Sequence, residues 1–343
     1  MPLLEFTPSG IYCHQADIYI DPWKKVNKAI ITHAHSDHSR WGMKHYLAHP
    51  MSIPVMKLRL GNDISVQALE YNEKLIINGV EISLHPAGHI PGSAQIRVSY
   101  KGETWVASGD YKIEDDGLST AFEPVKCNTF ITECTFGLPV YKWKPQAEIF
   151  AEMNQWWKRN KENGIATIVT AYSLGKAQRV LQNLDLNIGK VYTHGAVENT
   201  NQVLRTAGLP LNDTTLITRE TNKKELQGNL IIAPPSALNT PWANKFKPMS
   251  DGIASGWMML RGTRRRRAAD RGFALSDHAD WPGLLEAIKA TEAENVITTH
   301  GYTAVFSKYL NEIGINAVEE KTLFTGESID ASEADKTLEE HAA

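Results

Sequence analysis

Histidine and aspartate are concentrated in one short segment, His-Ala-His-Ser-Asp-His at positions 33–38. The segment follows the apolar run 29–31, which predicts a short buried strand, and a helical stretch to Leu47 is expected beyond it. In extended backbone the side chains of His33 and His35 point to the same side, because alternate residues share a face. Neutral imidazole and carboxylate groups suit zinc, manganese or iron, so the segment predicts a metal site rather than a histidine-rich surface turn.

Further candidate ligands can reach a second point close by. Asp37 and His38 come where the chain leaves the strand, while His89, Asp110 and His300 each end an apolar stretch beside glycine. One polar residue capping a strand is ordinary, but three such ends predict ligands gathered at one edge of a sheet. Two divalent ions roughly 3.5–4 Å apart can share a bridging hydroxide and clamp the oxygens of an in-line displacement, which suits hydrolysis of phosphate compounds.

The elements that must position these residues change character along the chain. Up to about residue 137 short strands separated by Gly and Pro turns are expected, at 75–77, 81–84, 95–99 and 104–107. A helical period then begins, with Ile149 and Trp156 on one face of a helix that stops at 163–164. Strand–helix pairs follow, which predict a small parallel α/β sheet: strands 167–169, 190–192 and 230–233, helices 176–186 and 196–207. Near residue 272 the first kind of structure resumes, with strands 273–275 and 296–298 and helices 282–291 and 304–313.

Composition narrows the class of protein. A chain of 343 residues can bury a large core and is long enough for two units. Its three cysteines show no paired spacing, which predicts a reduced, cytoplasmic setting. No stretch approaches the ~20 apolar residues of a membrane span, and the first ten residues lack the pattern of a signal peptide. The formal net charge is −3, so nucleic-acid binding would depend on local basic patches.

The motifs in combination resemble the metallo-β-lactamase superfamily, and within it the nuclease branch that carries a β-CASP-type insertion. Artemis, the cleavage-and-polyadenylation endonuclease and ribonuclease J belong to that branch. The resemblance extends to about Phe324 and is greatest to bacterial ligase-associated DNA exonucleases, often named RNA 3′-end processing factors. Besides segment 33–38, the matching positions are Asp21, His89, Asp110, Glu133, His278 and His300.

This resemblance implies two divalent metal ions per chain, Zn or Mn, and a role for each matching residue. It assigns one ion to His33, His35 and His89, the other to Asp37, His38 and His300, with Asp110 bridging the two. Asp21 would hold a ligand imidazole by a hydrogen bond, with Asp17 as a rival that fits the motif less well.

The resemblance also implies an acid catalyst. His278 would face the scissile phosphate and protonate the leaving alkoxide, while Glu133 orients its imidazole. Asp37, Asp21, Glu133 and His278 together form the predicted catalytic group. The alternatives are a buried structural acid at Glu133 and a surface loop histidine at position 278.

The expected fold is α/β, an αββα metallo-β-lactamase sandwich of two mixed sheets with helices outside. Residues 1–137 and 268–326 would form this domain, and residues 138–267 an inserted β-CASP-like domain with a small parallel sheet. The acidic tail 327–343 is expected to be disordered. The substrate would lie in the cleft between the two domains, above the metal ions.

Three patches could bind a nucleic-acid backbone. The run Arg264, Arg265, Arg266 and Arg267 comes shortly before His278, although such a run can be a solvated loop. Tyr141 and Trp143 alternate with lysines, as in base stacking or in an edge strand that packs its aromatic rings inward. Ser173 is expected to cap a helix that begins near Lys176, a place that binds phosphate but is also an ordinary cap.

The resemblance predicts a metal-dependent DNA exonuclease acting on single-stranded or repair-generated ends, with a DNA ligase or helicase as a possible partner. The alternative is an RNA-processing nuclease, because a histidine at position 300 is typical of the RNA-cleaving members, whereas Artemis-like DNA nucleases carry valine there. Phe136 also replaces the tyrosine common in its motif. A binding-only subunit would have lost metal ligands, and a glyoxalase- or lactamase-type hydrolase would not account for Glu133, His278 and His300.

Overall fold

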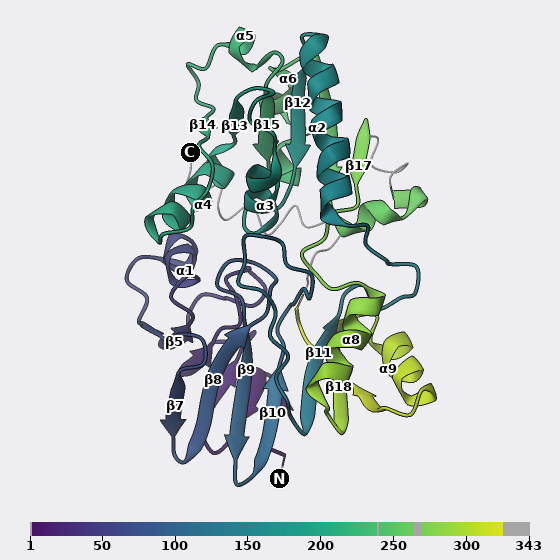
Figure 1. The fold of residues 1–343 in the computed structure, drawn as a ribbon. Helices are drawn as coiled ribbons and strands as arrows, with labels where there is room; N and C mark the ends of the chain where they lie inside the picture. Colours follow the sequence, from purple (N-terminus) through teal and green to yellow (C-terminus); the bar gives the residue numbers. More distant parts are fainter. Residues whose placement is uncertain (1, 239, 264–268, 325–343) are drawn as a thin grey trace. The chain divides into compact units, whose positions relative to one another are not determined.

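The computed structural model describes residues 2–238, 240–263 and 269–324, which form two compact units (Figure 1). The first unit comprises the described residues up to Lys142 and those from His278 onward, and the second comprises Trp143–Asp277. The sequence placed these boundaries at 137/138 and 267/268. The second boundary comes later in the structure because β17 (Arg271–Phe273) pairs with β16 (Met249–Ala254) in the sheet of the second unit. The predicted acidic tail 327–343 lies outside the described residues.

The first unit contains two mixed sheets, one of six strands and one of seven. The six-stranded sheet has the order β1 (Glu5–Thr7), β2 (Gly10–Cys13), β3 (Ile18–Ile20), β4 (Lys28–Ile30), β5 (His45–Ala48) and β6 (Val66–Ala68). The seven-stranded sheet has the order β19 (Asn316–Glu319), β18 (Asn295–Gly301), β11 (Thr129–Cys134), β10 (Glu103–Ala107), β9 (Ala94–Tyr100), β8 (Val80–Pro86) and β7 (Lys74–Ile77). Strands β10, β11, β18 and β19 run parallel to one another.

Alternating side chains of the seven-stranded sheet build two separate cores. In β11, Ile131 packs into a core shared with the six-stranded sheet, whereas its neighbour Phe130 packs into a core on the opposite face. That opposite face is covered by helices α8 (Trp281–Thr291) and α9 (Thr303–Glu312). Because alternate residues of a strand face opposite sides, one strand can serve both cores. The expected sandwich of mixed sheets with outer helices is therefore confirmed.

The second unit is built on a parallel sheet of six strands. Their order is β14 (Thr215–Leu216), β13 (Val191–Thr193), β15 (Leu230–Ala233), β12 (Ala166–Thr170), β16 and β17. Its helices of eight or more residues within the described chain are α2 (Gln146–Glu162), α3 (Lys176–Asn183) and α4 (Gly195–Thr206). Helix α2 ends just before residues 163–164, as predicted, and buries Ile149, Met153, Trp156 and Trp157. The alternation of strands and helices along the sequence thus predicted this parallel α/β sheet.

The prediction of a helical stretch to Leu47 is wrong. Residues 36–44 form turns and bends, β5 begins at His45, and the next helix is α1 (Ile53–Leu60). Segment 33–38 therefore sits in an irregular loop after β4, where each side chain can take its own direction.

Candidate metal centre

The candidate ligands lie where strands of the first unit end. Segment 33–38 follows β4, His89 lies between β8 and β9, Asp110 follows β10, and His300 is near the end of β18. In the seven-stranded sheet β8, β10 and β18 run in the same direction, so their carboxyl ends lie at one edge of that sheet, whereas β4 belongs to the six-stranded sheet. The gathering of ligands at strand ends that the sequence predicted is thus present in the fold.

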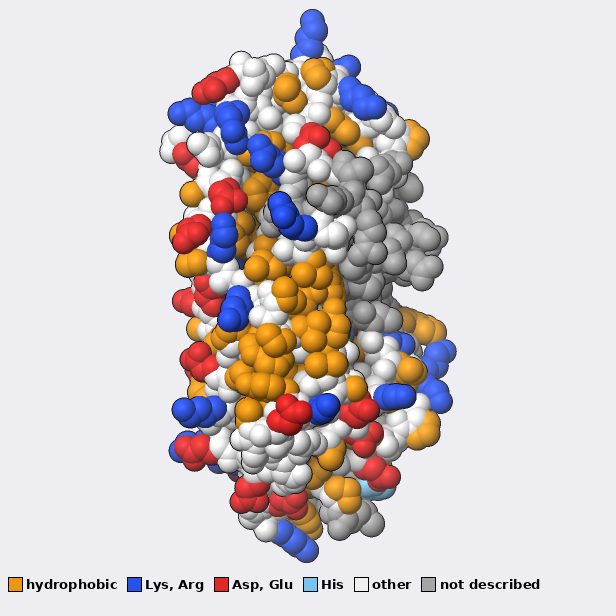
Figure 2. Space-filling view, turned by 90° about the vertical axis from the view of Figure 1, so that its right-hand side faces the viewer, with side chains coloured by type: hydrophobic (Ala, Val, Ile, Leu, Met, Phe, Trp, Pro, Cys, Tyr) orange, Lys and Arg blue, Asp and Glu red, His pale blue; other side chains and the backbone are white. Residues whose placement is uncertain are grey.

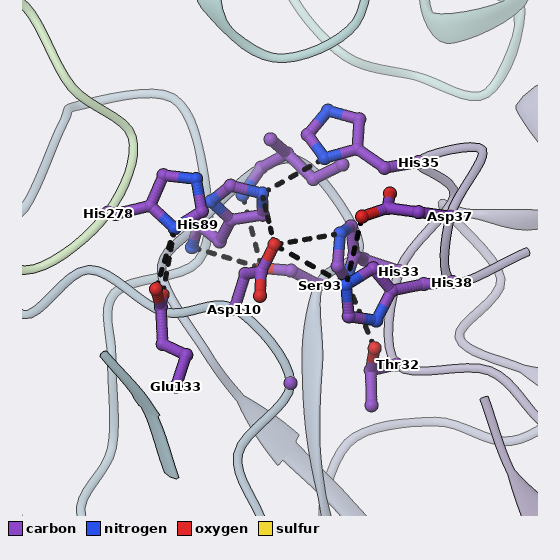
Figure 3. Close-up of polar contacts among 12 residues, drawn as sticks. Thr32, His33, His35, Asp37, His38, His89, Ser93, Asp110, Glu133 and His278 are labelled. Atoms are coloured by element: carbon purple, nitrogen blue, oxygen red, sulfur yellow. Dashed lines mark hydrogen bonds and ion pairs between the residues drawn. The ribbon is translucent and has the colours of Figure 1, made fainter. Parts of the chain in front are cut away.

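Asp110 lies at the centre of the cluster (Figure 3). Its Oδ2 atom is 3.5 Å from Nε2 of His38, 3.6 Å from Nε2 of His33 and 3.8 Å from Nε2 of His89. The side chains of these four residues are at most 4 % exposed. Three ring nitrogens therefore converge on one buried carboxylate.

Ligand atoms of these and neighbouring residues form sets that could hold metal ions. Within each set the atoms lie within 4.8 Å of one another; the sets are His33, His35, His89 and Asp110, then Asp37, His38 and His300, and finally Asp110, Glu133 and His278. The first two sets, joined by Asp110 beside His38, are the residues that the resemblance assigns to two ions.

Buried atoms without a partner test whether these residues fit a metal. Among the described residues, Nε2 of His33, Nε2 of His38, Nδ1 of His300 and Oδ1 of Asp110 have no hydrogen-bond partner. Buried polar atoms are nearly always paired, and a cation bound in this cluster could satisfy the unpaired atoms. A cavity of about 20 Å³ borders His38, Asp110 and His300, which is room for one ion or water. Imidazole and carboxylate donors suit zinc, manganese or iron, and the residues therefore fit.

The protonation of the cluster also suits a metal. Burial, reinforced by the neighbouring imidazoles, holds the pKa of His33 well below its usual value, which favours the neutral imidazole that a metal requires. Burial also opposes the charged form of His38, but Asp110 and Asp37 outweigh it and raise the pKa of His38 to about 10. Burial raises the pKa of Asp110. A bound cation would take the place of the His38 proton, because metal ligands must be deprotonated.

Asp21 organises two of the imidazoles from behind. Nδ1 of His38 donates to Oδ2 of Asp21 at 2.7 Å, which leaves Nε2 directed at Asp110. The hydroxyl of Thr32 donates to the same carboxylate oxygen at 2.5 Å and lies 3.0 Å from Nδ1 of His33. Hydrogen bonds of this kind fix the tautomer of a metal-ligating histidine. The rival Asp17 is elsewhere: its side chain is 59 % exposed and accepts from the hydroxyl of Tyr12.

Two glycines beside the ligands have no room for a side chain. Gly109 precedes Asp110 at φ +57°, and a Cβ atom there would lie 2.7 Å from Cβ of Thr32. Gly301 follows His300 at φ +103°, and its Cβ atom would lie 2.2 Å from the carbonyl oxygen of Cys134. Left-handed backbone and this crowding both require glycine. The glycines noticed in the sequence thus keep the ligand-bearing turns tight.

Glu133 and His278 form a buried pair on the other side of Asp110 (Figure 3). Nδ1 of His278 lies 2.9 Å from both carboxylate oxygens of Glu133. Burial alone would raise the pKa of Glu133, but His278 and further hydrogen bonds outweigh it and lower that pKa. The ring centroids of His278 and His89 are 4.6 Å apart, so the pair adjoins the candidate ligands.

Several residues of the site carried no signal in the sequence. Thr32 bridges Asp21 and His33, and the hydroxyl of Thr135 donates to Glu133 at 2.5 Å. The ring of Phe324 stacks on His38, with centroids 4.3 Å apart and planes 8° apart. A single hydroxyl or ring residue has no characteristic spacing, so only the fold identifies these partners. For Thr32, its place directly before segment 33–38 was the one hint.

The predicted nucleic-acid patches fare differently. Arg264, Arg265, Arg266 and Arg267 lie outside the described residues. Tyr141 is fully buried, so it is not exposed for base stacking, and it belongs to no strand, so it is not part of an edge strand. Trp143 is half-buried. The face drawn in Figure 2 shows lysine and arginine side chains interspersed with acidic ones.

The prediction that Ser173 caps a helix is wrong. Helix α3 begins at Lys176 with Gly175 as its N-cap, and Ser173 is buried in the turn before it. The side chain of Lys176 is 1 % exposed, and its Nζ lies 3.5 Å from Oδ2 of Asp277. A lysine near a helix start resembles a phosphate site in the sequence, but its acidic partner lies far along the chain and only the fold brings them together.

Comparison with known proteins gives relatives of two kinds. A probable DNA ligase of Opitutus terrae is 27 % identical over 311 residues, 90 % of this chain and 30 % of the ligase. Endoribonuclease ysh-1 of Neurospora crassa is 31 % identical over 128 residues, 36 % of this chain and 15 % of that protein. Cleavage and polyadenylation specificity factor subunit 3 of Dictyostelium discoideum is 26 % identical over 124 residues, 35 % of this chain and 16 % of that protein.

A crystal structure of a protein of unknown function from Enterococcus faecalis V583 shares the fold, with a TM-score of 0.59. The two are 11 % identical, and the match covers 86 % of this chain and 79 % of the other. No protein-family model matches the chain. The chain spans less than a third of each curated relative named above.

Together these matches confirm the resemblance to nucleases of the metallo-β-lactamase type and the α/β fold that it implies. Among the helices that the structure describes, none is long and apolar enough to cross a membrane.

Proposed function

We propose that the chain is a metal-dependent phosphodiesterase that removes nucleotides from an end of DNA. The relatives support a metal-dependent nuclease, since they include endoribonucleases matched over a third of the chain. The long match to a probable DNA ligase supports DNA as the substrate and DNA repair as the setting. Action at ends, a ligase or helicase partner and a cytoplasmic location rest on the predicted resemblance.

The residues of the first two sets described above would hold two divalent ions. We assign one ion to His33, His35 and His89, and the other to Asp37, His38 and His300, with Asp110 between them. Bound there, zinc or manganese would supply Lewis acidity toward a phosphate and lower the pKa of a bound water to about 7. Asp21 and Thr32 would keep Nε2 of His38 and of His33 directed into the site.

The observation that carries the proposal is the buried pair of Glu133 and His278 beside the ligands. The Glu133 carboxylate holds Nδ1 of His278 at 2.9 Å, so that Nε2, on the other side of the ring, points away from Glu133. A carboxylate so placed favours the protonated imidazole. A histidine held in this way can donate its Nε2 proton to the oxygen that leaves phosphorus, which phosphodiester cleavage requires.

RNA is the second candidate substrate, and two observations favour it. His300 completes the set with Asp37 and His38, and a histidine there is the feature that the resemblance links to RNA cleavage. The endoribonuclease relatives also reach 31 % identity, although over a much shorter stretch than the ligase match. Apart from His300, the residues assigned above would serve either substrate equally, so the substrate must be measured.

A direct assay compares both substrates in one experiment. Purified protein is incubated with Mn²⁺ or Zn²⁺ and end-labelled single-stranded DNA and RNA of one sequence, with the Asp37→Ala variant beside it. We expect stepwise shortening of DNA from one end and no shortening with Asp37→Ala. An Asp63→Ala variant is the matched control, because Asp63 is exposed in the same unit.

The outcomes separate the proposals. Preferential cleavage of RNA would replace the DNA assignment with the RNA one. Full activity in Asp37→Ala would refute the metal site, and absence of cleavage of either strand with metal bound would refute the nuclease.

A further inference from the structure

The second unit contains a cavity of about 1110 Å³ that the proposed hydrolysis does not use. The candidate metal ligands all belong to the first unit. Ligand pockets for small molecules usually have volumes of about 300–1,000 Å³, so this space is large enough for more than a simple anion.

The described lining is basic and contains no acidic side chain. Arg219, Lys223 and Lys245 line the cavity, together with Thr218, Thr221 and Thr240. Three cations without a carboxylate among them favour an anionic ligand, and guanidinium and ammonium groups both bind phosphate.

One wall of the cavity is aromatic. The ring of Trp242 packs edge-on against His194, with centroids 4.8 Å apart, and against Phe246, with centroids 4.6 Å apart. All three residues line the cavity, and the ring of Trp242 contacts the other two. A preformed aromatic wall favours a ligand with a planar ring, because nucleobases stack on aromatic side chains whatever their identity.

The cavity also lies where open α/β sheets bind ligands. His194 directly follows β13, Leu216 ends β14, and Ala237 comes shortly after β15. Strands β13 and β15 are neighbours, but the chain leaves them in opposite directions across the sheet. From β13 it continues to β14 at one edge, and from β15 it continues past β12 to β16. The strand order therefore reverses between β13 and β15. Crevices outside the carboxyl ends of strands at such a reversal are the usual ligand sites of these sheets.

We propose that this cavity binds a nucleoside phosphate, with the base on the aromatic wall and the phosphate among Arg219, Lys223 and Lys245. The same chemistry is offered by a free mononucleotide and by one nucleotide of a strand. The described lining shares no residue with the proposed metal centre, so binding to this cavity can be measured without hydrolysis.

Calorimetric titration of the full chain in EDTA, which prevents turnover, tests the proposal. The probes are AMP, dAMP, adenosine and ribose 5-phosphate, and a 5′-phosphorylated 12-nucleotide DNA serves as competitor. We expect AMP and dAMP to bind, and adenosine and ribose 5-phosphate to bind at least about tenfold more weakly, because each lacks one half of the recognised ligand.

A charge-matched pair of double variants locates the site. Arg219→Gln with Lys245→Gln removes two exposed cations from the lining and should weaken AMP binding at least about tenfold. Lys158→Gln with Arg159→Gln removes two exposed cations from α2 and should leave binding unchanged. Thermal melting of both confirms that each variant is folded.

Either absence of AMP binding or equal AMP binding by the two double variants would overturn the proposal. Competition by the oligonucleotide would assign the site to a strand, and lack of competition would assign it to free nucleotide; both uphold the chemistry. Because the readout is binding without metal, a chain inactive as a nuclease could still satisfy this test.

Discussion

Two buried clusters of charged side chains differ in how many of their polar atoms have a partner within the cluster. In the second unit, Asp277 accepts from Arg179 at 3.2 Å and lies 3.5 Å from Nζ of Lys176, with all three side chains at most 4 % exposed. In the first unit the cluster around Asp110 is just as buried, but His33 and His38 keep ring nitrogens without a partner among the described residues. Burial is common to both clusters, and incomplete pairing distinguishes the cluster around Asp110 in the first unit.

The difference has a chemical cause. The cluster of the second unit contains its own cations, and Arg179 also donates to the carbonyl oxygen of Ser276 at 2.6 Å. The cluster around Asp110 combines carboxylates with imidazoles that are ligands only when neutral, so it gains a cation only by protonation or from a metal. A buried cluster in which every charge has a partner is costly to break, whereas a buried cluster with unpaired ligand atoms can accept a cation. Substitutions in the two clusters should therefore affect different measurements.

Asp110→Asn should have the largest effect. The amide keeps the shape but removes the charge between the two proposed ions, so we expect loss of bound metal and a fall in turnover of about a thousandfold or more. The urea midpoint of the metal-free protein should not fall, because burial already disfavours the ionised form and raises the pKa of Asp110. Metal content, turnover and urea unfolding measure these three effects. Asp63→Asn, an exposed carboxylate of the same unit, is the control, and unchanged metal and turnover in Asp110→Asn would contradict the assignment.

Asp277→Ala should show the reverse pattern. Removing the carboxylate leaves Lys176 and Arg179 buried without it, which should lower the free energy of unfolding by about 3 kcal/mol. The loss should be the same with and without EDTA, since no metal is involved. Urea unfolding in both conditions measures it, with the exposed Asp213→Ala as control. A loss seen only in the presence of metal would erase the distinction between the clusters.

The sequence predicted the open cluster better than the closed one. The ligands of the first unit share residue types and stand at strand ends beside glycine, so local patterns locate His33, Asp110 and His300 together. The ion pair between Lys176 and Asp277 joins residues far apart in the chain, and the sequence around Lys176 does not indicate which residue is its partner. The predicted phosphate role for that lysine followed from a helix start alone, and the burial of its side chain could not be foreseen.

The fold follows the same division. Strands with apolar patterns, such as 230–233, were predicted to the residue, because their pattern is local. Strand β17 was assigned to the wrong sheet, because sheet membership depends on pairing with β16 and not on composition. The residues after segment 33–38 were predicted as a helix but form turns and then β5. The prediction failed because the pairing of β5 with β4 and β6 overrides the local helical pattern.

Glu133→Gln separates a ligand from a positioning group. An amide can still bond His278, but it lacks the negative charge that favours the protonated ring, so turnover should fall about a hundredfold with metal retained. The alkaline limb of the pH–rate profile should also move to lower pH. Metal content and rate profiles test this beside Glu312→Gln, an exposed site on α9. Loss of metal would instead make Glu133 a ligand, as its set with Asp110 and His278 permits.

The smallest effect is expected from Asp21→Asn, for which the chain offers a close control. Asp21 and Asp17 both have left-handed backbone, with φ of 42° and 50°, a conformation that asparagine tolerates well. Only Asp21 accepts from Nδ1 of His38, and replacing such a carboxylate behind a ligand typically weakens metal binding about 10- to 100-fold. Metal titration should show this loss in Asp21→Asn and no change in Asp17→Asn, whose carboxylate faces solvent. Equal affinities would mean that the tautomer of His38 is fixed without Asp21, and that Asp21 serves the loop and not the metal.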